Sequence, residues 1–233
     1  MQCVILAGAT KSLSQAPPVP PSLLPVRNRP FLHYQLAWLA GQDIHDILLC
    51  VGPHGEDIER YAEDGRAWSV RLQYVSEGTE RLGSGGLLRL AWDQRLLKPS
   101  FFALEGDVFV PAELAPVQDF FATRTEPILM VLAKAGHPGA PGQAALESHK
   151  VTRYLHQAPH RDLPYGSTGL FALRPEAVEQ GIPPRTTYEL ADLCQKWSER
   201  GKISGFETSA RSYSVAAPEG LKEFTDFVTA AAL

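Results

Sequence analysis

Three short segments of this 233-residue sequence could bind a phosphorylated ligand. The backbone of Leu6, Ala7, Gly8 and Ala9 offers N–H groups, and Lys11 adds a positive charge. The run Gly83, Ser84, Gly85 and Gly86 opens a predicted helix, so a ligand could approach its backbone at the positive helix end. Asp107, in Glu105-Gly106-Asp107, could hold a Mg²⁺ ion that bridges phosphate oxygens.

Each segment also has a plain structural interpretation. The first could be a strand-to-loop turn with a solvated lysine, and the second a flexible turn; both interpretations stay open. Asp107 could be an ordinary acidic turn residue, but its place after a buried strand favours the functional interpretation. His156 and His160 lie four residues apart in an apparent loop, and we expect both at the surface.

Several other chemistries are excluded by missing patterns. The chain lacks the G-x-x-x-x-G-K-[ST] phosphate loop, the G-x-G-x-x-G dinucleotide fingerprint and the G-x-S-x-G nucleophile elbow. Its three cysteines are scattered without metal-ligand spacing, and Cys3 and Cys50 lie in apolar runs, so we expect buried thiols.

The candidate segments follow predicted strands that alternate with helices. Short apolar runs predict strands at residues 3–7, 46–52, 70–75, 101–104 and 127–133, and helical spacing predicts helices at 31–40, 55–62, 85–93 and 113–123. This alternation is typical of βαβ crossovers and a parallel sheet, whose ligands bind beyond the carboxyl ends of the strands.

The rest of the chain has a different pattern. Residues 16–30 contain six prolines and are expected to form an ordered surface loop, and 136–143 are expected to form another loop. Strands are predicted at 151–155, 167–173, 203–206 and 213–216, and helices at 187–200 and 219–231. We therefore expect one domain over residues 1–233, with a nucleotide-binding half at about 1–135 and a second half at about 136–233.

Composition sets the broad class. Hydrophobic residues make up 44% and charged residues 21% of the chain, and the net charge is −4, so the sequence predicts a globular protein without a nucleic-acid footprint. We find no signal peptide and no span long and apolar enough for a membrane, and we expect a cytoplasmic protein.

In motif order, the chain resembles the sugar-1-phosphate nucleotidyltransferases, and in particular the short bacterial heptose-1-phosphate guanylyltransferases. The matching motifs are VILAG at 4–8, LLPV at 23–26, RPFLHYQL at 29–36, LGSGG at 82–86, GD at 106–107 and YSVAAPEGL at 213–221. The resemblance implies a Rossmann-like three-layer α/β fold with a mainly parallel central sheet and helices on both faces. It also implies transfer of a nucleotidyl group from a nucleoside triphosphate to a sugar 1-phosphate.

The resemblance also implies roles for single residues. The backbone of Leu6 to Ala9 and the run Gly83 to Gly86 would contact the nucleotide. Asp107 would hold the catalytic Mg²⁺, and Lys11 would stand in for the family's phosphate-loop arginine. The sugar would lie near Gly166, Ser167, Thr168 and Gly169.

The chain departs from the family pattern at several charged positions. The phosphate loop is about two residues shorter than the family's G-G-x-G-T-R-L. The lysine before LLPV falls at Pro21, the glutamate-lysine pair before the sugar loop falls near His156 and Gln157, and the second metal aspartate falls at Ser214. Glu105, where the family often has asparagine, is a candidate replacement for the lost metal ligand.

These departures leave two main hypotheses. The chain is either an active nucleotidyltransferase that uses Asp107, Mg²⁺ and Lys11, or a catalytically inactive homologue. The inactive homologue would be a binding or regulatory protein that kept a nucleotide or sugar pocket, or only an interaction surface. A glycosyltransferase of similar fold is a third, weaker hypothesis, because Glu105-Gly106-Asp107 lacks the usual D-x-D spacing. The expected ligands are a nucleoside triphosphate and a sugar phosphate or nucleotide-sugar, while a second copy of the chain or another protein partner stays open.

Overall fold

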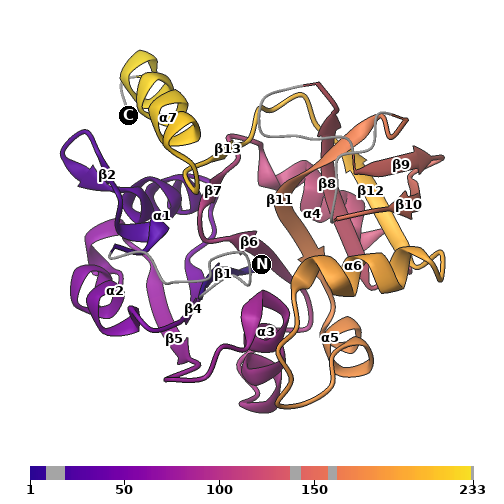
Figure 1. Ribbon diagram of the computed structural model, residues 1–233, viewed down its shortest axis with the longest axis horizontal. Coiled ribbons are helices and arrows are strands. Elements are labelled where there is room, and N and C mark those ends of the chain that lie inside the picture. Colours follow the sequence, from indigo (N-terminus) through magenta and orange to yellow (C-terminus); the bar gives the residue numbers. More distant parts are fainter. Residues whose placement is uncertain (9–18, 137–142, 157–161, 232–233) are drawn as a thin grey trace.

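One nine-stranded sheet runs through the protein. The computed structural model describes residues 1–8, 19–136, 143–156 and 162–231. In sheet order the strands are β5 (Arg71–Ser76), β4 (Asp46–Val51), β1 (Gln2–Ala7), β6 (Phe101–Glu105), β11 (Tyr165–Leu173), β8 (Ile128–Lys134), β12 (Ile203–Glu207), β10 (Lys150–Tyr154) and β9 (Ala144–Glu147) (Figure 1).

The strand directions bring the predicted site segments to one edge of the sheet. Strands β5, β4, β1 and β6 are mutually parallel, as predicted, and β12 is parallel to β8. Strand β11 is antiparallel to both β6 and β8, with Leu170 opposite Leu104. The beginning of β11 therefore lies beside the carboxyl end of β6, so Gly169 and Glu105 come from the same edge.

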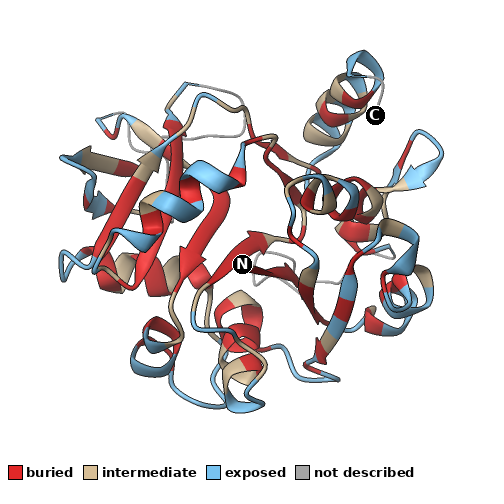
Figure 2. Ribbon diagram, turned by 180° about the vertical axis from the view of Figure 1, so that it is seen from behind, coloured by how far each residue is buried: buried red, intermediate tan, exposed pale blue. Residues whose placement is uncertain are grey.

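Helices cover both faces of the sheet, which confirms the expected layered α/β fold. Helices α3 (Gly83–Asp93), α5 (Pro175–Gly181) and α6 (Leu190–Ser198) pack on one face. Helices α1 (Phe31–Gly41), α2 (Gly55–Ala62) and α4 (Leu114–Ala122) pack on the other. Side chains alternate along β1, so Val4 and Leu6 face the first group while Cys3 and Ile5 face the second. The central strands are accordingly buried (Figure 2).

The last helix, α7 (Pro218–Ala230), belongs to a separate aromatic cluster. Its Phe224 contacts Phe31 of α1 with ring centroids 5.0 Å apart, and Phe109 with centroids 5.1 Å apart. Phe109 lies in β7 (Val108–Phe109), which pairs with β13 (Tyr213–Ser214). This packing anchors the two short strands that follow the acidic segment.

Three local predictions were wrong or incomplete. Within the described part of the proline-rich stretch, a 3₁₀ turn (η1, Pro21–Leu23) precedes a hairpin of β2 (Pro25–Val26) and β3 (Arg29–Pro30) instead of a plain loop. Strand β9 and helix α5 were not predicted, because four and seven residues are too few to show a clear period. Helix α6 begins at Leu190 and not at residue 187, since the preceding residues pack against the glycine run.

Candidate functional site

The acidic turn is fixed against the end of β1. Strand β6 ends at Glu105, and Gly106 and Asp107 form a turn before β7. The Gly106 N–H donates to the Leu6 carbonyl oxygen over 3.0 Å. A Cβ at position 106 would lie 2.6 Å from that oxygen and 2.7 Å from Ala7 Cα, so only glycine fits this approach. The turn therefore holds Asp107 beside the end of β1, where a nucleotide was predicted to bind.

Asp107 is paired with Ser214 across the β7–β13 ladder. Ser214 Oγ donates to Asp107 Oδ2 over 2.9 Å. Burial raises the pKa of the Asp107 carboxyl, while the Ser214 hydrogen bond and the turn's own backbone lower it. The position that the resemblance assigns to the second metal aspartate thus does lie beside Asp107, but it holds a hydroxyl.

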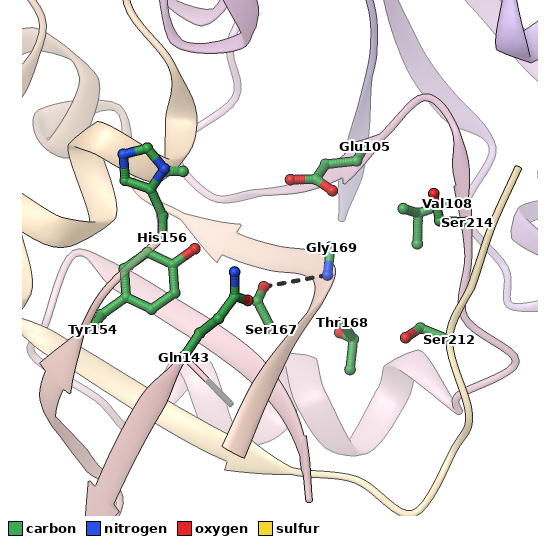
Figure 3. Close-up of a pocket in the computed structure, with 11 residues that line it drawn as sticks. Glu105, Val108, Gln143, Tyr154, His156, Ser167, Thr168, Gly169, Ser212 and Ser214 are labelled. Carbon is green, nitrogen blue, oxygen red and sulfur yellow. Dashed lines mark hydrogen bonds between the residues drawn. The ribbon is translucent and has the colours of Figure 1, made fainter. Parts of the chain in front are cut away.

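A cavity of about 230 Å³ opens next to this pair (Figure 3). Its lining is mostly polar and comes from β6, β7, β10, β11, β13, α6 and residues next to β9, β10 and β13. The lining residues are Glu105, Val108, Gln143, Tyr154, His156, Ser167, Thr168, Gly169, Ala191, Ser212 and Ser214. The predicted sugar loop supplies Ser167, Thr168 and Gly169, whereas Gly166 lies buried in β11 and is not part of the lining.

Glu105 directs its carboxylate into this cavity (Figure 3). Burial raises the pKa of Glu105 to about 8, and the charges of Asp107 and Glu189 add to the shift. Gly169 makes room for it: φ is +80° there, and a Cβ would lie 3.0 Å from Glu105 Oε2 and 3.1 Å from Val108. Glu105 is therefore part of the cavity lining, and Asp107, whose charge acts on it, lies two residues further along the chain.

Tyr154 and His156 form the opposite wall (Figure 3). Burial raises the pKa of Tyr154, so its hydroxyl stays protonated. His156 Nε2 lies 2.7 Å from Asp192 Oδ1. The expectation that His156 is a surface residue was wrong, because the nearby α6 supplies Asp192 and half-buries the ring. His160 lies outside the described residues.

The glycine run packs against the protein's own chain. The N–H groups of Gly85 and Gly86 both donate to the Tyr188 carbonyl oxygen, over 2.8 and 3.0 Å. The Ser84 N–H and Oγ both donate to Glu189 Oε2, over 3.2 and 2.6 Å. Cβ atoms at Gly83, Gly85 and Gly86 would lie 2.7 to 3.0 Å from this segment or from Thr186. The glycines thus permit close packing of α3 on the entry to α6, and nucleotide binding here stays a prediction.

The first predicted segment is only partly described. Leu6 is buried in the core, and Ala7 and Gly8 are half-buried at the end of β1. A Cβ at Gly8 would clash with Leu87 and lie 3.4 Å from Glu77 Oε1. Ala9 and Lys11 lie outside the described residues. Glu77 is 5% exposed and accepts the Leu82 N–H over 2.6 Å, so a buried carboxylate joins this segment to the glycine run.

Several site residues gave no signal in the sequence. Tyr154 and Glu189 belong to none of the motifs named above, Gln35 lies in the RPFLHYQL run without an assigned role, and the contacts of all three join elements far apart along the chain. In the described ranges, no group of three or more histidine, cysteine, aspartate or glutamate side chains is arranged for a metal ion. The described helices are all too short or too polar to cross a bilayer. Cys3, Cys50 and Cys194 are buried free thiols, as expected for the first two.

Comparison with known proteins decides the family. The sequence pattern of the nucleotidyl transferase family matches residues 11–210. The chain belongs to this family. The resemblance drawn from its motifs is therefore confirmed, and Asp107, Ser214 and the cavity all lie in or next to the matched region.

Two curated relatives of this family member are guanylyltransferases. A D-glycero-alpha-D-manno-heptose 1-phosphate guanylyltransferase of Campylobacter jejuni is 28% identical over 120 residues, which are 51% of this chain and 52% of the relative. A mannose-1-phosphate guanylyltransferase of Mycobacterium tuberculosis is 26% identical over 160 residues, 66% of this chain and 44% of the relative. The chain thus matches about half the length of each.

Solved structures agree on the fold of this family member. The structure of HddC from Yersinia pseudotuberculosis matches with a TM-score of 0.79 at 18% identity, covering 97% of this chain and 98% of the other. The inositol-1-phosphate CTP transferase of T. maritima matches with a TM-score of 0.78 at 15% identity, covering 98% and 94%. At these identities the likeness establishes the architecture alone.

Proposed function

We propose that this chain transfers a nucleotidyl group from a nucleoside triphosphate to a sugar 1-phosphate. A phosphate oxygen of the sugar attacks the α-phosphorus, the bond from that phosphorus to the bridging oxygen breaks, and pyrophosphate leaves. The observation that carries the proposal is the acidic turn: in a nucleotidyl transferase chain, Asp107 and Glu105 lie beside a polar cavity at the sheet edge.

Mg²⁺ is the cation we propose for this reaction, and the residues present fit it. Mg²⁺ is commonly bound through one or two carboxylates, with phosphate and water oxygens completing the shell. Asp107 and Glu105 would supply those carboxylates, and the ion would neutralise charge on the phosphates. Asp107 is held by Ser214, while Glu105 must lose its proton before it can bind the ion.

The chain's own residues would position the two substrates. We propose that the backbone of residues 6–9 and the region of 83–86 bind the nucleotide, with Lys11 facing its phosphates. Ser167, Gly169, Tyr154 and Ser212, which line the cavity, would surround the sugar. His156, which Asp192 holds, is the one basic side chain among the described lining residues, and it would face the sugar phosphate.

A second candidate is a binding protein that has lost turnover. Two observations favour it: Ser214 stands where a second carboxylate would be, and the first N–H groups of α3 already bond Tyr188 and Glu189. Such a protein would bind a nucleotide or nucleotide-sugar without releasing pyrophosphate.

One assay separates the two candidates. The protein is incubated with Mg²⁺, each nucleoside triphosphate and a panel of sugar 1-phosphates, and pyrophosphate is measured. The transferase is supported if pyrophosphate is released only when a particular sugar 1-phosphate is present, and if this release falls on the order of 10³-fold in Asp107→Asn. Nucleotide binding by calorimetry without release supports the binding protein, and neither binding nor release rejects both.

A further inference from the structure

The carbonyl oxygens of the acidic turn are all held by donors from outside it. Gln35 Nε2 donates to the Val108 oxygen over 2.8 Å and to the Glu105 oxygen over 3.2 Å. Ser22 Oγ donates to the Gly106 oxygen over 3.3 Å, and the Val215 N–H donates to the Asp107 oxygen over 2.8 Å. Four consecutive carbonyl groups are thus fixed, so the turn has little freedom to rotate.

Gln35 is an unusual residue for its place. It lies on the buried face of α1 and is fully buried, among residues that are otherwise apolar or aromatic. Its Oε1 has no hydrogen-bond partner in the described part of the protein. An unpaired buried amide oxygen is unfavourable. The amide nitrogen, which bonds on both sides of Asp107, is the feature that accounts for a glutamine at this position.

Ser22 supports the same turn from a different element. It is 2% exposed and lies in the 3₁₀ turn η1. Its hydroxyl donates to the Gly106 oxygen, the one carbonyl of the acidic turn that neither Gln35 nor Val215 bonds. Ser22 and Gln35 precede the turn residues that they bond by 84 and 70 residues, so two distant segments of the chain meet at this turn. Side chains that orient metal-binding carboxylates commonly affect metal affinity and activity without touching the metal.

We infer that Gln35 and Ser22 are positioning residues, which fix the carboxylates of Glu105 and Asp107 in the geometry that binds a divalent cation. The inference rests on the proposed function, because that function makes these carboxylates a cation site. Neither side chain touches a substrate; each acts through the main chain of the turn.

The test compares Gln35→Met, which removes the amide at similar length, with Gln42→Met, at the residue that directly follows the same helix. Gln42 bonds the Leu114 N–H, away from the turn. Binding of Mn²⁺ is measured from the electron paramagnetic resonance signal of the free ion, which needs no turnover. We expect Gln35→Met to bind Mn²⁺ at least about tenfold more weakly than wild type, and Gln42→Met to bind it within about twofold. Thermal melting shows whether each variant is folded.

A milder pair keeps the test decisive if Gln35→Met does not fold. Ser22→Ala removes only the hydroxyl, and Ser204→Ala removes a buried hydroxyl that bonds Glu126 in another part of the sheet. Weaker Mn²⁺ binding in Ser22→Ala but not in Ser204→Ala supports the inference, even if wild type releases no pyrophosphate and the proposed function fails. Mn²⁺ binding that is unchanged in folded Gln35→Met and Ser22→Ala, or absent from wild type, overturns it.

Discussion

Ser214 Oγ donates a hydrogen bond to Asp107 Oδ2 over 2.9 Å, across a ladder of two-residue strands. The ladder is held from outside by α7, whose Phe224 and Phe227 pack on Phe109 and Tyr213. The C-terminal helix therefore determines which side chain stands next to the acidic turn. In this chain that side chain carries a hydroxyl, so Glu105 is the one carboxylate among the described residues that line the cavity.

Restoring a carboxylate at this position should strengthen cation binding. Ser214→Asp would place a second negative charge beside Asp107, so we expect Mn²⁺ affinity to rise on the order of tenfold. Without metal the repulsion between carboxylates should lower the melting temperature, and added Mn²⁺ should recover it. Ser209→Asp, on the exposed surface, is the control. Equal Mn²⁺ affinity in wild type and Ser214→Asp would show that no cation binds at Asp107.

Glu105 makes the stability of the protein depend on pH. Its pKa rises from 4.5 to about 8 on folding, so the folded state favours the neutral acid. The stabilising contribution is therefore fully present below about 4.5 and is lost as pH rises through about 8. Glu105→Gln removes this dependence. As pH rises from 4.5 to about 8, the melting temperature of the variant should therefore increase relative to that of wild type. A constant difference across the range would contradict the raised pKa.

The same proton should couple to cation binding. Because Glu105 must ionise before it binds Mn²⁺, affinity in wild type should increase as pH approaches about 8, and it should change less with pH in Glu105→Gln. Glu179→Gln, exposed on α5, should behave like wild type. An equally steep pH dependence in Glu105→Gln would exclude Glu105 as a ligand.

Gly169 gives a test of the space around Glu105. Gly169→Ala puts a Cβ at φ +80°, 3.0 Å from the Glu105 carboxylate. Gly201→Ala puts one at φ +63° with no atom within 4 Å. We expect Gly201→Ala to lower the free energy of unfolding by about 1 kcal/mol from backbone strain alone, and Gly169→Ala by about 2 kcal/mol or more. Denaturant titration measures both, and only Gly169→Ala should also weaken Mn²⁺ binding.

The α3–α6 junction gives a prediction on stability. Ser84 Oγ donates to Glu189 and accepts the Leu190 N–H over 2.9 Å, so Ser84→Ala removes two bonds at the start of α6. We expect a loss of about 1–2 kcal/mol in unfolding free energy. Ser76→Ala, which loses an exposed turn contact to Gly78, should cost less than about 0.5 kcal/mol. Similar losses in both variants would mean that the junction contributes little.

The sequence predicted the strands and helices of the parallel half because their signals are local. An apolar run ending in glycine identifies β1, and helix α2 was predicted with its observed ends. The carboxyl-end rule then pointed to Glu105 and Asp107 before any relative was considered. The start of β11 was expected near the site only from the family resemblance, because the direction of a strand is not visible in one sequence.

Other parts of the site depend on contacts that a single sequence does not contain. Glu189 reaches Ser84 across 105 residues, and Gln35 reaches Glu105 across 70. The glycine run was interpreted either as a place where a ligand approaches the backbone or as a flexible turn, because glycine signals close approach without saying what approaches. Here the approaching group is the backbone of Tyr188 and Glu189. His156 was placed at the surface since α6, which supplies its partner Asp192, is distant in the sequence.

The central claim is that Asp107 holds the cation for nucleotidyl transfer, and the most direct measurement follows the α-phosphate itself. Each α-³²P-labelled nucleoside triphosphate is incubated with Mg²⁺ and the sugar 1-phosphate panel, and labelled nucleotide-sugar is separated by chromatography. Wild type and Asp119→Asn, an exposed control on α4, should form labelled product, while Asp107→Asn should form on the order of 10³-fold less. Product formation by Asp107→Asn at the wild-type rate would contradict the account.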